Sequence, residues 1–123
     1  MQDARVFYAC EHEAVAVAEW LDRRLRAAGT QEADAVRVAA KLKADWPKLI
    51  HLLFHHECET QMIMLSISGE GAAIEVSLVT ETCGKFDPCI ARQAAADGLG
   101  SLVRDEVEGL ARLTIPTVCH ARA

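Results

Sequence analysis

Histidine and cysteine are the side chains of this sequence best suited to chemistry at a site. The chain carries five of each among its 123 residues, and His55, His56 and Cys58 stand almost side by side. Cys83 and Cys89 follow, six positions apart. Zinc prefers four nitrogen or sulfur ligands in tetrahedral geometry, which imidazole and thiolate groups supply. These five residues are therefore a candidate zinc site, although the chain lacks the doubled Cys-x2-Cys spacing of a zinc-binding framework.

The same side chains have a purely structural interpretation, which we favour. Cys10, Cys83 and Cys119 are typical of small core or loop residues. A histidine pair at the end of a helix is stabilised by the helix dipole alone. A reactive thiol is a further alternative for Cys83 or Cys89, because the positive charge of the nearby Lys85 favours a thiolate. No cofactor follows from the structural interpretation, whereas the alternative requires zinc.

The most regular pattern in the chain lies between residues 61 and 86. On both sides of a Gly-Glu-Gly loop at 69–71, apolar side chains alternate with other residues. The alternating residues are Ile63, Leu65 and Ile67 before the loop and Ile74, Val76 and Leu78 after it. A period of two around a short glycine loop predicts an antiparallel hairpin with one buried face. An isolated hairpin is not stable in water, so other elements must cover that face.

Two helical segments precede the hairpin and can supply the cover. The first runs from about Ala14 to Ala28 with an apolar stripe at helical spacing, and it ends at Gly29. The second begins after Thr30, which we expect to cap it, and extends to His55. Pro47 lacks an amide hydrogen, so the second helix should be kinked or restarted there.

The remaining elements are shorter. The β-prone run at 5–10 predicts an edge strand, and helices are expected at 89–96 and at 101–110. The inward face of the last helix would carry Leu102, Val103, Val107 and Leu110. Leu113, Ile115 and Val118 indicate one or two short terminal strands.

This order of elements, without a linker or an internal repeat, predicts a single domain over residues 1–123. We expect an α+β fold, a two-layer sandwich in which helices pack on one face of an antiparallel sheet. A strand at the edge of that sheet exposes backbone groups that can pair with another chain. The N-terminal strand therefore favours self-association as a homodimer.

Several segments occur in an order that resembles the GHKL ATPase fold of histidine kinases and gyrases. The resemblance starts at residues 17–30, where the family has a helix, a glycine turn and the beginning of a second long helix. The hairpin at 61–82 follows them, as it does in that fold. Gly84-Lys85-Phe86-Asp87-Pro88 resembles the end of the family's first glycine box, and Gly98-Leu99-Gly100 resembles its second. Within the family, the chain is most similar to the small anti-sigma-factor serine kinases. The resemblance covers most of the chain.

This resemblance implies the remnant of a nucleotide pocket between the second long helix and the two glycine segments. Its residues would be His51, Gly84, Phe86, Asp87, Gly98 and Gly100.

The residues that carry the family's phosphoryl transfer are missing. The family places on its long helix a Glu and, four residues later, an Asn that holds Mg²⁺ on the phosphates. Depending on the register, these positions hold Pro47 and His51 or Lys48 and Leu52. Thr82 stands where the family has the Asp that accepts a hydrogen bond from adenine, and Glu81 could serve only if the loop is shifted by one residue. The resemblance therefore implies a module that has lost ATP chemistry and is not an enzyme.

The composition narrows the choice of partner. A formal net charge of -5 argues against nucleic acid, because phosphate backbones require a basic footprint. The polar start MQDAR has no apolar run behind it, so we expect neither a secretory signal nor a membrane-spanning segment. We expect a cytoplasmic regulatory module that binds a protein partner. The alternative is a small cytoplasmic protein that responds to metal or redox state through its His/Cys cluster.

Overall fold

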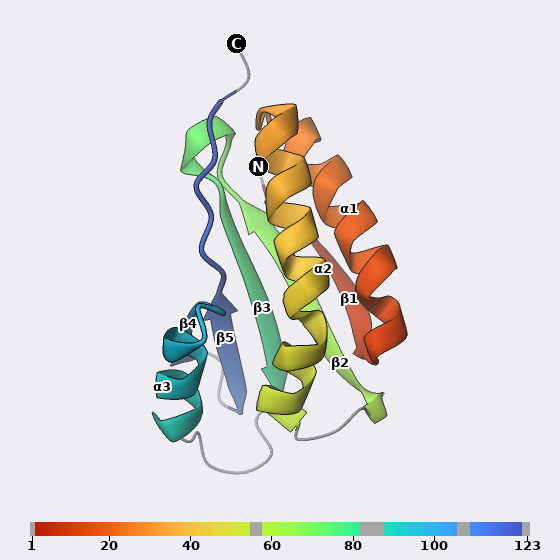
Figure 1. The fold of residues 1–123 in the computed structure, drawn as a ribbon, viewed down its shortest axis with the longest axis vertical. Coiled ribbons are helices and arrows are strands. Elements are labelled where there is room, and N and C mark those ends of the chain that lie inside the picture. The colour runs from red at the N-terminus through yellow and green to blue at the C-terminus, as the bar shows by residue number, and fades with distance from the viewer. Residues whose placement is uncertain (1, 55–57, 82–87, 106–108, 122–123) are drawn as a thin grey trace.

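The computed structural model describes residues 2–54, 58–81, 88–105 and 109–121. The elements along the chain are β1 (Gln2–Ala9), the 3₁₀ turn η1 (Glu11–Glu13), α1 (Ala14–Ala27), α2 (Glu32–Phe54), β2 (Cys58–Ser68), the 3₁₀ turn η2 (Gly71–Ala73), β3 (Glu75–Glu81), α3 (Pro88–Ala96), β4 (Ser101–Arg104) and β5 (Leu110–Thr114). Figure 1 shows the two long helices side by side in front of the sheet.

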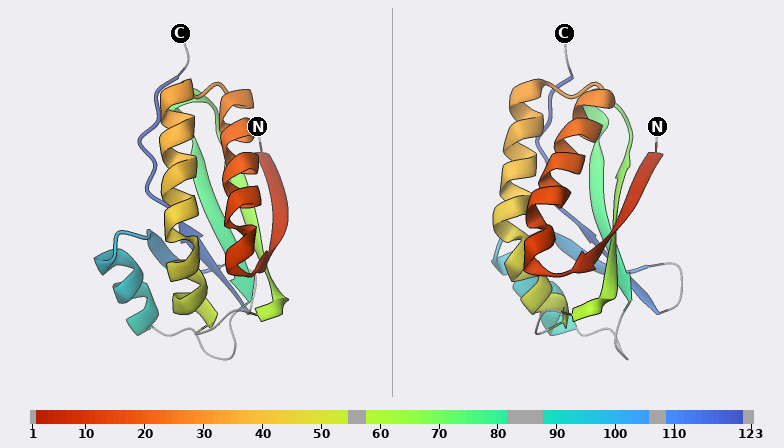
Figure 2. Two further views of the ribbon diagram at one scale, coloured as in Figure 1. Left: turned by 45° about the vertical axis from the view of Figure 1, so that its right-hand side comes forward. Right: turned by 90° about the vertical axis from the view of Figure 1, so that its right-hand side faces the viewer.

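The described strands form one five-stranded sheet in the order β1-β2-β3-β5-β4. Every neighbouring pair in it is antiparallel. When the molecule is turned by 90°, the helices lie together on one side of the sheet (Figure 2). The predicted α+β sandwich with helices on one face is therefore confirmed.

The central hairpin is the predicted one. β2 pairs with β3 in a register that places Leu65 opposite Leu78 and Ile67 opposite Val76. These side chains are buried against the helices. The period-two pattern thus identified both the pairing and the face that becomes buried.

The helical layer supplies the cover that this face requires. Leu21 and Leu25 of α1 and Ile50 of α2 are fully buried in the same core. Trp46 of α2 is also fully buried, and its indole N–H donates to the Cys10 carbonyl at 2.8 Å. That bond satisfies the single polar atom of the Trp46 side chain, which lets the ring occupy the interior at little cost.

The prediction of a helix at 101–110 is wrong. Ser101–Arg104 and Leu110–Thr114 are the paired strands β4 and β5, with Leu102 opposite Leu113. Leu102 is buried and Val103 is half-exposed, as alternate residues of a strand should be. The expected inward residue Val107 lies outside the described residues. The terminal strand at Leu113 is confirmed as part of β5.

Two expectations for α2 also change. The helix continues through Pro47, so the expected restart is wrong, while the alternative of a kink stays a prediction. Thr30 does not cap it, because the buried Thr30 hydroxyl has no hydrogen-bond partner among the described residues. The Thr30 amide instead donates to the Leu25 carbonyl and closes the end of α1, where Gly29 follows the helix as predicted. Within the described part of the chain, no helix combines the length and the apolar character needed to cross a membrane.

Candidate functional site

The structure describes only part of the expected nucleotide-pocket remnant. Gly84, Phe86 and Asp87 lie outside the described residues. His51 is exposed near the end of α2, where its Nε2 lies 3.5 Å from Oε1 of Glu11 in η1. Gly98 and Gly100 lie in the turn between α3 and β4. The predicted role of these residues in nucleotide binding therefore stays a prediction.

Gly98 and Gly100 each have a backbone reason for being glycine. The Leu99 amide donates to the Ala94 carbonyl at 2.9 Å, and the Gly98 amide donates to Ala95 at 3.2 Å. With φ of 69° at Gly98, this arrangement closes the C-terminus of α3. A Cβ on Gly100 would lie 2.3 Å from the Thr114 carbonyl oxygen of β5. The turn thus ends a helix and leads into a strand, where the family resemblance implied the start of a helix.

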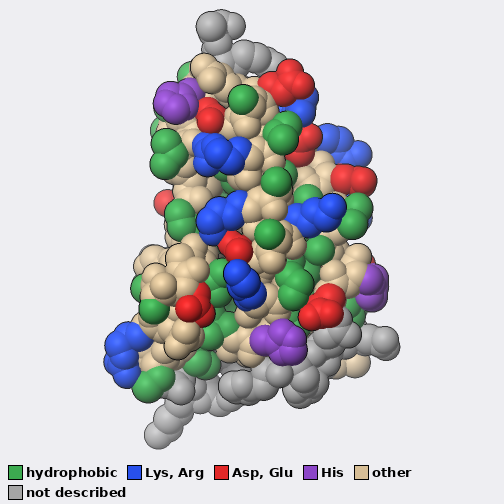
Figure 3. Space-filling model, in the orientation of Figure 1, with side chains coloured by type: hydrophobic (Ala, Val, Ile, Leu, Met, Phe, Trp, Pro, Cys, Tyr) green, Lys and Arg blue, Asp and Glu red, His purple; other side chains and the backbone are tan. Residues whose placement is uncertain are grey.

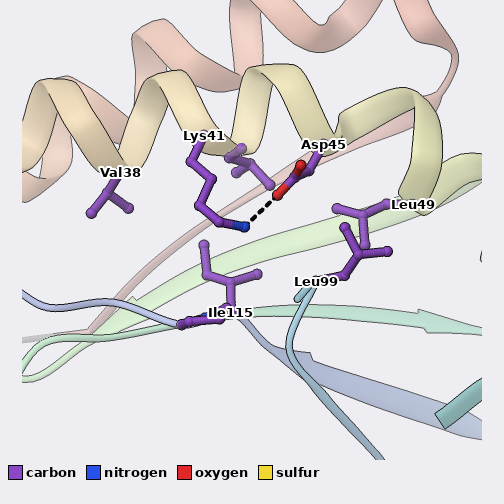
Figure 4. Close-up of a pocket in the computed structure, with 8 residues that line it drawn as sticks. Val38, Lys41, Asp45, Leu49, Leu99 and Ile115 are labelled. Carbon is purple, nitrogen blue, oxygen red and sulfur yellow. Dashed lines mark hydrogen bonds and ion pairs between the residues drawn. The ribbon is translucent and has the colours of Figure 1, made fainter. Parts of the chain in front are cut away.

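A small pocket lies between α2 and this turn (Figure 4). Lys41 spans its mouth, with Nζ 2.5 Å from Oδ2 of Asp45 and 3.1 Å from the Gly98 carbonyl oxygen. The remaining lining is mostly apolar: Val38, Leu42, Leu49, Leu99, Ile115 and Pro116. The volume is about 10 Å³, which is close to the smallest space that holds one water molecule. Among the described residues, this junction therefore has room for about one water molecule.

The zinc alternative falls largely on residues whose positions are not described. His55, His56 and Cys83 lie outside the described residues, and so does the side chain of Cys58. Cys89 is exposed on α3, and its sulfur accepts a hydrogen bond from Arg92 Nη2 at 2.9 Å. In the parts of the chain that are described, no three His, Cys, Asp or Glu side chains form a group that could hold a metal. The zinc site therefore also stays a prediction.

The structure reveals a polar cluster at the start of α2 that the sequence analysis did not identify. We call it the Asp34 cluster, and it consists of Asp34, Arg37 and His120. Arg37 Nη2 donates to Asp34 Oδ1 at 3.0 Å. The backbone N–H of His120 donates to Asp34 Oδ2 at 2.8 Å, and His120 Nδ1 lies 2.9 Å from the same oxygen. Arg37 also donates to the Val118 carbonyl, so the cluster ties the C-terminal segment to α2.

The surroundings of the Asp34 cluster set its ionisation. Hydrogen bonds lower the pKa of Asp34 from 3.8 to about 2. The bond from Arg37 has the largest effect, and the bonds from the side chain and backbone of His120 have the next largest. Burial raises the pKa of the neighbouring Cys119 thiol, and the negative charge of Asp34 raises it further. At neutral pH the carboxylate is charged and the thiol is neutral. Cys119 is therefore a packed core residue, as expected, and not an activated nucleophile.

The sheet face opposite the helices carries an apolar surface. We call it the open sheet face, and it is formed by Val6 and Tyr8 of β1 with Met62 and Met64 of β2. The register pairs Val6 with Met64 and Tyr8 with Met62, so the four side chains point to the same side. Val6, Tyr8 and Met62 are each just over half exposed, at 52%, 52% and 53%. The helical side differs, because positive and negative side chains are interspersed there (Figure 3).

Comparison with known proteins defines the fold and no more. No protein-family model matches the chain, and no curated protein matches it. A crystal structure of the RsbU and RsbW domains of Rv1364c from Mycobacterium tuberculosis matches with a TM-score of 0.57 and 16% sequence identity. The match covers 99% of this chain and 33% of that one, so this chain spans about a third of the length of the protein it resembles.

Proposed function

We propose that this chain is a non-catalytic regulatory domain that acts by binding protein and that forms a homodimer in the cytoplasm. The open sheet face is the observation that carries the proposal. Its apolar side chains are contiguous on two neighbouring strands, and exposed apolar patches of this kind mark protein-interaction sites. The similarity in fold to part of the chain that holds the RsbU and RsbW domains supports a regulatory role.

A second copy is the occupant that the geometry favours for this face. β1 is one edge of the sheet, and Val6 and Tyr8 project from that same strand. A second copy can therefore bury the open sheet face and approach the β1 edge in one interface. The family resemblance supports a sigma factor or its antagonist as the regulatory partner.

The side chains of α2 support the absence of ATP chemistry. Pro47 and His51, or Lys48 and Leu52, occupy the helix positions where the resemblance would require a carboxylate and a carboxamide. None of these side chains can hold Mg²⁺ through a carboxylate or amide oxygen. Calorimetry with Mg-ATP should therefore detect no binding, and micromolar affinity would contradict this part of the proposal.

Substitutions on the open sheet face test the interface. We expect Tyr8→Glu and Met62→Glu to weaken self-association by about tenfold or more in sedimentation velocity over a concentration series, because each places a charge in an apolar contact. Val36→Glu is the matched control, since Val36 is 49% exposed on α2 in the helical layer. Equal behaviour of all three variants would show that the open sheet face is not the interface. A chain that stays monomeric and captures neither a sigma factor nor its antagonist would overturn the proposed function.

A further inference from the structure

A basic pocket lies between β1 and α1, away from the glycine turn and the Asp34 cluster. Arg5, Trp20, Arg23 and Arg24 line it, and its volume is about 560 Å³. Trp20, Arg23 and Arg24 are spaced i, i+3 and i+4, so they share one face of α1. Arg5 comes from β1, which diverges from α1 toward the N-terminus (Figure 2). Two separate elements thus bring three guanidinium groups around one indole ring.

Two of these guanidinium groups are already held in position. Arg24 Nε lies 2.9 Å from Asp3 Oδ2, and the other oxygen of Asp3 accepts the Ala4 backbone N–H at 2.9 Å. The Arg5 guanidinium lies over the Phe7 ring, 5.0 Å from its centroid, in a cation–π contact. Groups that are ordered before binding lose less conformational entropy when a ligand arrives.

Aromatic packing makes the base of the pocket rigid. Trp20 is only 5% exposed, and its ring meets the Phe7 ring edge-to-face with centroids 6.1 Å apart. Phe7 is itself buried and meets Trp46 in the same way at 6.5 Å. The arginines therefore project from the solid core of the domain and not from a loop.

The charge in the pocket is not balanced. Asp3 neutralises Arg24, but neither Arg5 nor Arg23 forms an ion pair with any described residue. Asp22 is engaged by Arg26 at 2.9 Å, on another face of α1. Glu19, one helical turn before Arg23, makes no ion pair with it. Two positive charges thus remain together on a chain whose net charge is -5.

We infer that this pocket binds a phosphomonoester group. Guanidinium groups bind phosphate through paired N–H donors in a planar fork, and a phosphomonoester carries a charge of about −1.5 to −2 at pH 7. That charge matches the two arginines without a carboxylate partner. The volume lies within the range of small-ligand sites, about 300–1,000 Å³. The group can belong to a small phosphorylated molecule or to a phosphorylated side chain of a protein. This inference does not rest on the proposed function, because it concerns different residues.

Calorimetry at low ionic strength tests the inference. The ligands are inorganic phosphate, a short phosphoserine peptide, and the same peptide with Glu in place of phosphoserine. We expect Arg23→Gln to weaken binding of both phosphate ligands by about tenfold or more, which is typical for a lost charge-assisted hydrogen bond. The melting temperature without ligand should stay the same or rise, because repulsion between like charges is relieved. Should Arg23→Gln fail to fold, Arg23→Lys keeps the charge, loses the fork, and should bind several-fold more weakly.

Lys43→Gln is the matched control, because it removes one exposed positive charge from α2 outside the pocket. Binding that is lost equally in this control, or kept in Arg23→Gln, overturns the inference. The same holds if the Glu peptide binds as tightly as the phosphopeptide. Equal affinity for inorganic phosphate and the phosphopeptide supports a small-molecule source. Tenfold tighter binding of the phosphopeptide supports a protein source.

Discussion

The Asp34 carboxylate connects two parts of the chain that are far apart in sequence. Both of its oxygens are used, one by Arg37 on α2 and the other by His120, 86 residues away. Because the carboxylate is mostly buried, its charge depends on these partners to replace water. The path of the C-terminal segment along α2 therefore depends on one ionised side chain.

Asp34→Asn should lower the melting temperature at neutral pH by a few degrees, since an amide cannot provide the charge that Arg37 and His120 stabilise. The folded-state pKa of Asp34 is about 2, below its ordinary value of 3.8, so this contribution is fully present above pH 3.8 and is lost as the pH falls through 2. The difference in melting temperature between wild type and variant should therefore shrink over that range. Asp97→Asn, at an exposed carboxylate that accepts only from Gln93 among the described residues, is the control and should change little. A pH-independent difference would contradict the assignment.

At the scale of elements, the turn between α3 and β4 depends on two glycines in different ways. Gly100→Ala should destabilise the domain by about 2–4 kcal/mol, because φ is 138° and the new Cβ would lie 2.3 Å from a backbone oxygen that cannot move aside. Gly98→Ala should lower the free energy of unfolding by about 1–2 kcal/mol, because alanine rarely adopts a φ of 69°. No steric clash adds to this cost, since no atom lies within 4 Å of the new Cβ. Urea denaturation measures both. Equal losses would show that the contact with Thr114 does not matter.

The sequence predicted some elements much better than others. The β2–β3 hairpin was predictable because alternation and a glycine loop act together over more than ten residues. The β4–β5 hairpin was not, because Leu102, Val103 and Leu110 also fit a helical stripe. Four- and five-residue strands are too short for alternation to decide between the two periods. There the pairing with β3, a long-range contact, determines the structure.

At the scale of the whole molecule, the sites form from residues that are distant in sequence. Asp34 and His120 are 86 residues apart in the sequence, and only the fold brings them into contact. The basic pocket likewise combines β1 with α1, and periodicity gives no sign of that convergence. Residues close together in sequence, such as His55, His56 and Cys58, can be recognised as a candidate site from the sequence alone. The polar clusters in the described part of the structure cannot, because their members are distant in sequence.

Metal analysis of the whole chain decides between the two functions that the sequence left open. We expect no stoichiometric zinc in the purified protein and no change in melting temperature with EDTA. The reason is that the spacing of the His and Cys residues does not match a zinc-binding framework. One zinc per chain that disappears in both His56→Ala and Cys58→Ala would favour the metal-responsive alternative. Thr60→Ala is a nearby control that removes no nitrogen or sulfur ligand.

The position of β1 has a consequence for how this protein is synthesised. Its partner strand lies far along the chain, so Gln2 cannot meet Ser68 until both helices have been translated. Closing so long a segment is slow compared with forming a helix, which places β1 docking late in folding. On the ribosome, a nascent chain therefore carries β1 without its partner strand until β2 has been translated. Chaperone capture of that strand should end only when β2 emerges from the exit tunnel.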